Sequence, residues 1–174
     1  MTVSVNAPDR ALPRVYATFD ATASKNPALT DLKYYFLLRA WLRHGPLAGR
    51  FIDVHDQAPR GKPVDLRAEL RRRLASSDML LLILSERTRR SEGWVTWEIE
   101  TGAGELRLPV VCGYVGRSLT PPDPRRGEPA WWPEALRRVL GAAPVQARHV
   151  AFRPGALAAE MGTAPGASQK SRYR

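Results

Sequence analysis

The sequence predicts an α/β protein in which helices cover both faces of a parallel sheet. Five short β-rich runs alternate with segments whose apolar residues recur every three or four positions, the pattern of repeated strand and helix units. The stretch MLLLILS at 79–85 is apolar throughout, as expected of a central strand between two helical layers. A length of 174 residues fits one domain with a substantial core.

The first half of the chain contains two predicted strands and two predicted helices. RVYATFD at 14–20 and RFIDV at 50–54 are short β-rich runs. An amphipathic helix is expected between them at 29–43, because its apolar positions share one face. These positions are Leu32, Tyr35, Leu38 and Leu42. The segment 54–63 has the composition of an exposed loop, and leucines four residues apart over 66–74 predict the next helix.

Beyond the apolar strand, the alternation of strand and helix continues to residue 152. Ser91 is placed to cap a helix that continues to about Gly102 or Gly104. The remaining elements are, in order, a buried strand at 108–116, a helix at 132–140 and a strand within 145–152.

This pattern places one domain at 14–152. We expect an N-terminal tail at 1–13 and a flexible, basic tail at 153–174, where Gly, Ala and Ser are frequent. The longest apolar run, at 79–84, is far shorter than the roughly 18 residues of a membrane-spanning helix. The N-terminus lacks the basic start and apolar stretch of a secretory signal. We therefore expect a cytoplasmic protein.

The net charge of +10 raises the question of nucleic-acid binding. Arg71, Arg72 and Arg73 are consecutive, so they point around a helix and form no stripe along it. The sequence has no recognition-helix, RNA-recognition or zinc-finger pattern. These observations argue against nucleic acid and leave general attraction for an anionic small molecule.

A metal site is not expected. Cys112 is the only cysteine and lies in the apolar run LPVVCGYV, where it suits a small core residue. The three histidines are scattered without the spacing of metal ligands.

Several polar and aromatic residues follow the predicted strands directly. In a parallel α/β sheet, ligands gather at the carboxyl ends of the strands. The residues delivered to that edge are Phe19, Asp20, Asp53, Ser85 and Tyr114. Asp20 and Asp53 also suit caps and turns, and Ser85 also suits the end of a strand, so structural roles stay open for all three.

The segment SEGWVTWEIE at 91–100 places two tryptophans around Glu98. In a helix, Trp94 and Glu98 are four residues apart and share a face. A carboxylate beside a buried indole is unusual, because an isolated buried charge costs several kcal/mol. The alternative is that Glu98 lies at the helix edge and reaches solvent or an arginine.

Four segments resemble a TIR-like domain. They are a first strand that ends in a small residue followed by Phe and Asp, a second strand FIDV, the stretch SSDMLLLILSERTRRSEGWVTWEIE, and the strand LPVVCGYV. The similarity covers about residues 14 to 150, is most specific from Ser77 to Glu100, and is closest to the bacterial branch that includes the Thoeris antiphage signalling proteins. The resemblance implies a flavodoxin-like three-layer fold with a five-stranded parallel sheet.

The resemblance also implies a function, namely cleavage of NAD by a glutamate in the helix after the third strand. Glu98 occupies that position, and Trp94 matches an aromatic residue found four positions earlier. The residues expected to contact NAD are Phe19, Asp20, Asp53, Ser85 and Trp94. The family further implies self-association and an ADP-ribose-derived product, linear or cyclic, that acts on a downstream effector. The loop ATASKNPA departs from many members, which carry acidic and aromatic residues there.

The chemistry of NAD explains why one carboxylate is sufficient. Ordinary glycoside hydrolysis needs two carboxyl groups, because the leaving oxygen must be protonated. Nicotinamide leaves as a neutral ring from a cationic state, so no general acid is required. A single carboxylate can stabilise the oxocarbenium-like ribose that develops in the transition state.

Other classes of protein stay open. The first is a non-catalytic interaction module. Exposed apolar surface on the loop at 54–63 would favour it, but that loop is polar. A phosphoacceptor receiver domain would need an aspartate where the third strand ends at Ser85. A nucleoside deoxyribosyltransferase would also use one glutamate on this kind of fold, and a nucleoside-exchange assay would identify it.

Overall fold

The computed structural model describes residues 12–21, 25–55, 65–116, 123, 125–142 and 144–162 of the chain. They contain a five-stranded sheet in which every pairing is parallel and the strand order is β2-β1-β3-β4-β5. The strands are β1 (Arg14–Thr18), β2 (Ile52–Asp53), β3 (Met79–Leu84), β4 (Val110–Tyr114) and β5 (Ala147–Ala151). This order is that of flavodoxin-like folds, so the predicted fold class is confirmed.

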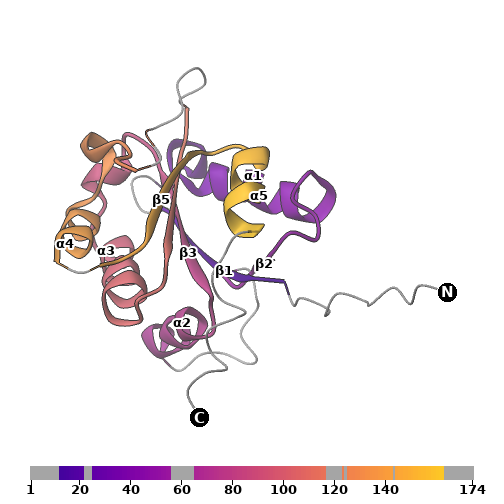
Figure 1. Cartoon of the computed structure of the whole chain (residues 1–174). Coiled ribbons are helices and arrows are strands. Elements are labelled where there is room, and N and C mark those ends of the chain that lie inside the picture. The colour runs from indigo at the N-terminus through magenta and orange to yellow at the C-terminus, as the bar shows by residue number, and fades with distance from the viewer. Residues whose placement is uncertain are drawn as a thin grey trace, which may run out of the picture.

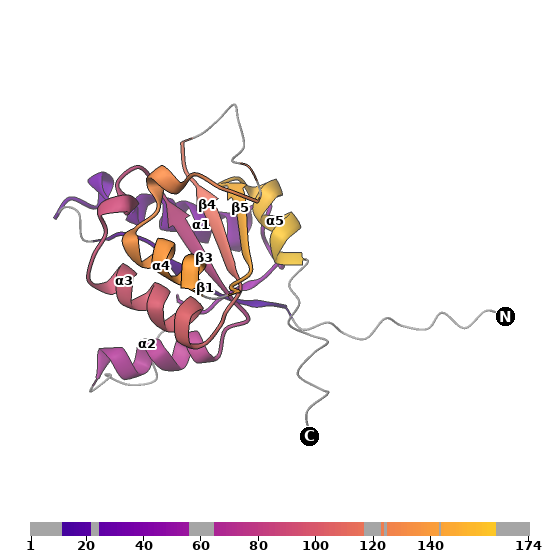
Figure 2. The same ribbon diagram turned by 60° about the vertical axis from the view of Figure 1, so that its left-hand side comes forward.

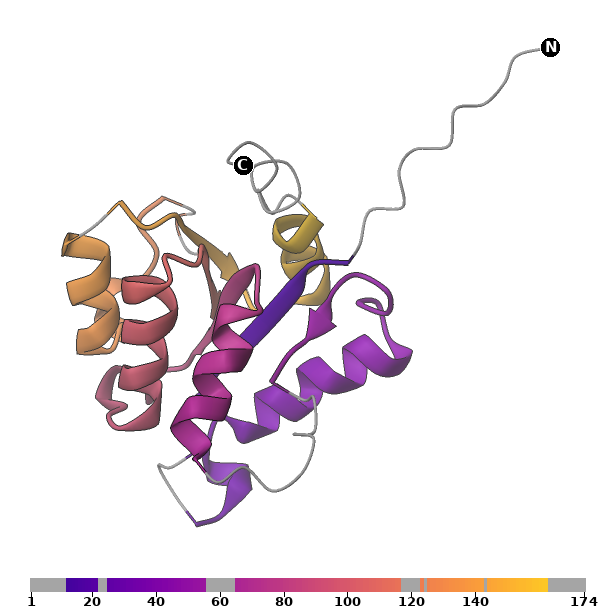
Figure 3. The ribbon, with the colours of Figure 1, turned by 90° about the horizontal axis from the view of Figure 1, so that it is seen from below.

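Helices cover both faces of the sheet. Figures 1 and 3 show α1 (Leu32–His44) and α5 (Pro154–Gly162) on one side. The other side carries α2 (Leu66–Ala75), α3 (Trp94–Ile99) and α4 (Glu134–Ala142), and Figure 2 shows α3 and α4 in front of the strands with α1 behind them. Short 3-10 turns are found at η1 (Pro27–Leu29), η2 (Thr88–Arg90) and η4 (Pro129–Trp131). Within the described ranges, every helix is too short or too polar to cross a bilayer.

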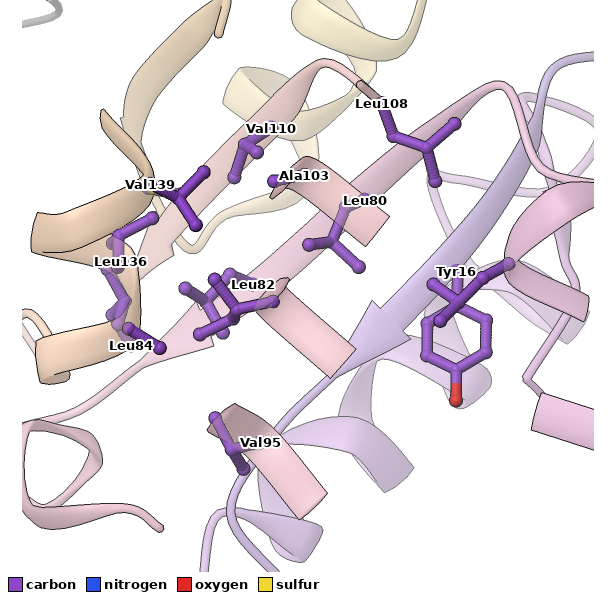
Figure 4. Close-up of a cluster of buried hydrophobic side chains, with 14 of the residues drawn as sticks. Tyr16, Leu80, Leu82, Leu84, Val95, Ala103, Leu108, Val110, Leu136 and Val139 are labelled. Carbon is purple, nitrogen blue, oxygen red and sulfur yellow. The ribbon is translucent and has the colours of Figure 1, made fainter. Parts of the chain in front are cut away.

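β3 is buried along its whole length, as predicted for 79–85. Its side chains alternate between the two layers. Those that face α2, α3 and α4 are Leu80, Leu82 and Leu84, and those that face α1 and α5 are Met79, Leu81 and Ile83. Burial of each such side chain contributes on the order of 2 kcal/mol to folding. Figure 4 shows the first of these clusters, with Tyr16 to one side of the labelled aliphatic side chains.

α3 begins later than expected, and the prediction that Ser91 caps it is wrong. The capping position is Gly93, whose φ of 62° lies in the left-handed region that favours glycine. The Ser91 hydroxyl instead donates a hydrogen bond to Asp20 Oδ2 at 2.6 Å. After Ile99 the helix continues as a π-helical segment, η3 (Glu100–Glu105). The expected end near Gly102 or Gly104 is therefore close to the observed one.

The prediction of a flexible tail at 153–174 is wrong for residues 154–162, which form α5. Leu157 and Met161 are buried on α5, at 0% and 1% exposure, and pack in the same core as α1. These two side chains are four residues apart, so one face of an alanine-rich segment is enough to anchor a helix. The remaining tail residues, 1–11 and 163–174, lie outside the described residues.

The loop expected at 54–63 lies largely outside the described residues. Val54 is buried at 1% exposure, which corrects the prediction of an exposed loop at that position. Its amide donates to the carbonyl of Val15, so it continues the pairing of β2 with β1.

Candidate active site

Glu98 lies on α3 with its side chain directed at β1, and only 5% of it is exposed. Its Oε1 accepts a hydrogen bond of 2.7 Å from the hydroxyl of Tyr16. Tyr16 and Thr18 share a face of β1 because side chains alternate along a strand. The alternative in which Glu98 reaches solvent or an arginine is therefore wrong.

Burial raises the pKa of Glu98 from 4.5 to about 7. The hydroxyls of Tyr16 and Thr18 act in the opposite direction, because they favour the ionised carboxylate. The Thr18 hydroxyl lies beside the carboxylate but makes no hydrogen bond of ordinary geometry with any described residue. Near neutral pH, Glu98 is thus divided between its protonated and ionised forms.

The Trp94 indole, expected to be buried beside Glu98, lies at the surface. It is 39% exposed, and its ring packs edge-on against Trp97 with centroids 5.8 Å apart. The guanidinium of Arg67 lies 5.8 Å from the ring centroid. The groups found against the Glu98 carboxyl group are the hydroxyls of Tyr16 and Thr18 on β1.

Phe19 and Asp53 lie close to Tyr16, around His55. The Phe19 and Tyr35 rings stack at 4.4 Å, and the His55 ring is 5.3 Å from both Phe19 and Tyr16. Asp53 accepts hydrogen bonds from the Tyr35 hydroxyl at 2.8 Å and from the His55 amide at 3.0 Å. These bonds hold the turn after β2, which is the structural role left open for Asp53.

Asp20 and Ser85 belong to a second polar group, at the end of β3. Asp20 accepts the hydrogen bond from Ser91 described above. Thr88 donates from its hydroxyl to Asp31 at 2.9 Å and accepts from the Ser85 amide at 2.7 Å. Ser85 Oγ accepts from the amide of Arg87, so Ser85 fixes the turn that follows the strand.

An open hollow of about 860 Å³ lies next to this second group. Its walls include Asp20, Ser91, Gly93 and Trp94, together with three arginines and two glutamates from the turn before α3. These are Arg87, Arg89, Arg90, Glu86 and Glu92. Glu98 is not part of the lining, because its carboxyl group is directed at Tyr16 beneath β1. The structure thus brings Asp20 and Trp94 to one hollow, and Phe19 and Asp53 to the aromatic group beside Glu98.

Sequence reasoning missed three residues of this site, namely Tyr16, His55 and Arg73. The alternation of β1 places Tyr16 on the face of Thr18, but no local pattern shows which helix covers that face. His55 falls in the loop expected to be exposed, and Arg73 is one of three consecutive arginines expected to point around a helix. Arg73 in fact donates to the His55 carbonyl at 2.9 Å and pairs with Glu69 at 2.8 Å.

No group of three or more His, Cys, Asp or Glu side chains is arranged to hold a metal ion within the described part of the chain. Cys112 is buried, and burial raises the pKa of its thiol above the ordinary range.

The flavodoxin-like parallel sheet and the buried glutamate on the helix after its third strand are the arrangement that the resemblance to TIR-like domains implies. Residues 16–117 match the family described as Thoeris protein ThsB, TIR-like domain. The match covers more than half of the chain, so the protein belongs to this family.

Among solved structures, the chain is similar to the TIR domains in the activated Roq1 resistosome that directly recognises the pathogen effector XopQ. The two share 18% sequence identity with a TM-score of 0.43, over 75% of this chain and 85% of that one. No curated protein matches the sequence.

Proposed function

We propose that the protein cleaves NAD, releases nicotinamide, and forms an ADP-ribose-derived signal in bacterial antiphage defence, with Glu98 as the catalytic carboxylate. The observation that carries this proposal is the Glu98 carboxyl group itself. It is buried against β1, is held by a tyrosine hydroxyl, and has a pKa raised to about 7. Strongly perturbed acids of this kind concentrate at functional sites.

The reaction breaks the bond between ribose C1′ and the nicotinamide nitrogen. The bonding electron pair goes to the ring nitrogen, which loses its positive charge, so nicotinamide leaves without being protonated. The positive charge that develops on the ribose is stabilised by the Glu98 carboxylate. Water then adds to C1′ and gives up a proton to solvent, or a nitrogen of the adenine adds in its place and closes a cyclic product.

The residues proposed to contact NAD fall into two groups. Asp20 and Trp94 line the hollow, Phe19 and Asp53 adjoin Tyr16 through His55, and Ser85 shapes the turn that carries the hollow's arginines. Arg89 and Arg90 are exposed at the rim, where a pyrophosphate would find charge-assisted hydrogen bonds.

The test replaces the carboxylate with its uncharged amide. Glu98→Gln keeps the volume and the acceptor for Tyr16, so NAD binding should change little while nicotinamide release falls about 100-fold to 1,000-fold. Glu100→Gln is the matched control, because Glu100 lies two residues along the helix and pairs with Arg138 at 2.8 Å on the surface. Equal release by wild type and Glu98→Gln would remove Glu98 from catalysis.

Assembly provides a second test. Glu98 is only 5% exposed in the isolated chain, so a neighbouring subunit that reorganises this edge would be needed to complete the site. Nicotinamide release should then rise more steeply than in proportion to protein concentration. Release that stays proportional to concentration for a verified monomer would contradict this part of the proposal.

The burial of Glu98 equally favours a second candidate, a non-catalytic interaction module in which Tyr16 and Glu98 are structural. This candidate predicts self-association but no nicotinamide release at any protein concentration. Nucleoside exchange without NAD cleavage would instead indicate a deoxyribosyltransferase-like enzyme.

A further inference from the structure

The pair formed by Tyr16 and Glu98 has an unusual energetic balance. Tyr16 is 0% exposed, and Glu98 is the only described residue that its hydroxyl contacts by a hydrogen bond. Each polar group therefore compensates for the burial of the other. Replacing both partners of such a pair with apolar groups of similar shape is often neutral or stabilising. Stability alone does not explain why this hydroxyl and this carboxyl group face each other.

The hydrogen bond has a defined direction. Burial and the adjacent carboxylate raise the pKa of Tyr16 far above its ordinary value, so the phenol keeps its proton and acts as the donor. A donor of this kind favours the ionised form of Glu98. It also limits rotation of the carboxyl group, because Oε1 is tied to a rigid strand.

We propose that Tyr16 is a positioning residue, which fixes the Glu98 carboxyl group against β1 and favours its ionised form. This inference rests on the proposed function, since it assigns Tyr16 a role in the same reaction. Tyr16→Phe removes only the hydroxyl group. Any change in the reaction should then come from the changed position and pKa of Glu98.

Other charged or titratable groups adjoin the pair and must be separated from it. Arg73 on α2 lowers the pKa of Tyr16, and Tyr35 on α1 raises it. The His55 ring packs against Tyr16 from the turn after β2, and Thr18 adjoins the carboxylate from β1. For this reason the titration of Glu98 has to be observed directly.

The experiment follows the side-chain carboxyl carbon of Glu98 by NMR in the full chain, labelled with carbon-13 in glutamate. The signal of Glu98 is assigned by its loss in Glu98→Gln. In Tyr16→Phe, the titration midpoint should move upward by about one to two pH units, because a hydrogen bond to the anion is lost. Tyr34→Phe is the control, since Tyr34 lies on α1 and packs in the core on the opposite face of the sheet.

The pH profile of nicotinamide release is the second measurement. Release by Tyr16→Phe should fall about 5-fold to 50-fold at pH 7, because the ionised fraction of Glu98 falls by that factor, and it should approach the wild-type rate above the new midpoint. A combined Tyr16→Phe and Glu98→Gln variant should be no slower than Glu98→Gln alone.

The possible failures can be distinguished. An unchanged midpoint in a folded Tyr16→Phe variant overturns the role of Tyr16, as does an equal loss of release at every pH. If wild type releases no nicotinamide, the proposed function fails. The NMR midpoint still decides whether the Tyr16 hydroxyl favours the ionised form of Glu98.

Discussion

Two buried tyrosine hydroxyls belong to different strands of the sheet, and their surroundings differ. Tyr16 on β1 makes one hydrogen bond, to Glu98. Tyr114 on β4 accepts from the Glu128 amide at 3.0 Å and from Trp132 Nε1 at 2.7 Å, and its hydroxyl lies 3.0 Å from His149 Nδ1. Because its acceptor sites are filled, Tyr114 donates to His149, whose other ring nitrogen then carries the proton.

The difference separates a structural cluster from a candidate active site. The His149 ring is stacked on Trp132, with centroids 5.4 Å apart. Burial lowers the pKa of His149, so its neutral form is favoured in these uncharged surroundings. Glu98 is equally buried, but the described groups that favour its charged form are the hydroxyls of Tyr16 and Thr18, which offset only part of the cost of burial. Proteins tolerate such an imbalance mainly where function requires it.

The largest effect on stability is expected from Tyr114→Phe. This change leaves the Glu128 amide, the Trp132 indole and the His149 ring without their shared partner, at roughly 1 to 3 kcal/mol for each group. The free energy of unfolding, measured by urea titration, should fall by about 4 kcal/mol in total. A loss below about 1 kcal/mol would show that water replaces the hydroxyl and that the cluster is not structural.

A slightly smaller effect is expected from Glu98→Gln, and it depends on pH. The folded pKa is raised from 4.5 to about 7, so the folded state binds the proton more tightly than the unfolded state. The stability that Glu98 contributes is therefore complete below about pH 4.5 and is lost as the pH rises toward 7. Relative to wild type, Glu98→Gln should gain about 3 kcal/mol between pH 4 and pH 8.

This gain is measured as the difference in the free energy of unfolding between the two proteins at each pH. His149 titrates with the opposite sign, because its lowered pKa makes stability rise with pH, but it contributes equally to both proteins. A difference that is constant over this range would mean that Glu98 is not perturbed by burial.

The smallest effect is expected from Glu100→Gln. Glu100 and Arg138 are both more than 40% exposed, and solvent screens their ion pair. The free energy of unfolding should change by less than about 0.5 kcal/mol at any pH. A larger, pH-dependent change would mean that the α3 surface is electrostatically coupled to the core.

Much of the fold was predictable because its patterns are local. The helix expected at 29–43 is found at Leu32–His44, and the strand expected at 108–116 is found at Val110–Tyr114. Ser91 and α5 were mispredicted for related reasons. A serine before a helix suits a cap unless its hydroxyl is taken by a distant partner, here Asp20, and an alanine-rich segment folds only when a core accepts its leucine and methionine.

The sequence by itself determined the alternation of strands and helices, the central position of β3, and the identity of Glu98 as the residue to examine. Periodicity and composition carry the first two, because they depend on neighbours within one or two turns, whereas Glu98 was singled out by the resemblance to TIR-like domains. The burial of Glu98 was decided only by the tertiary structure. Its partner Tyr16 is 82 residues away in the chain, and the two meet because β1 pairs with β3 and α3 packs back across β1. No local pattern encodes that contact, and the charge state of the carboxyl group depends on it.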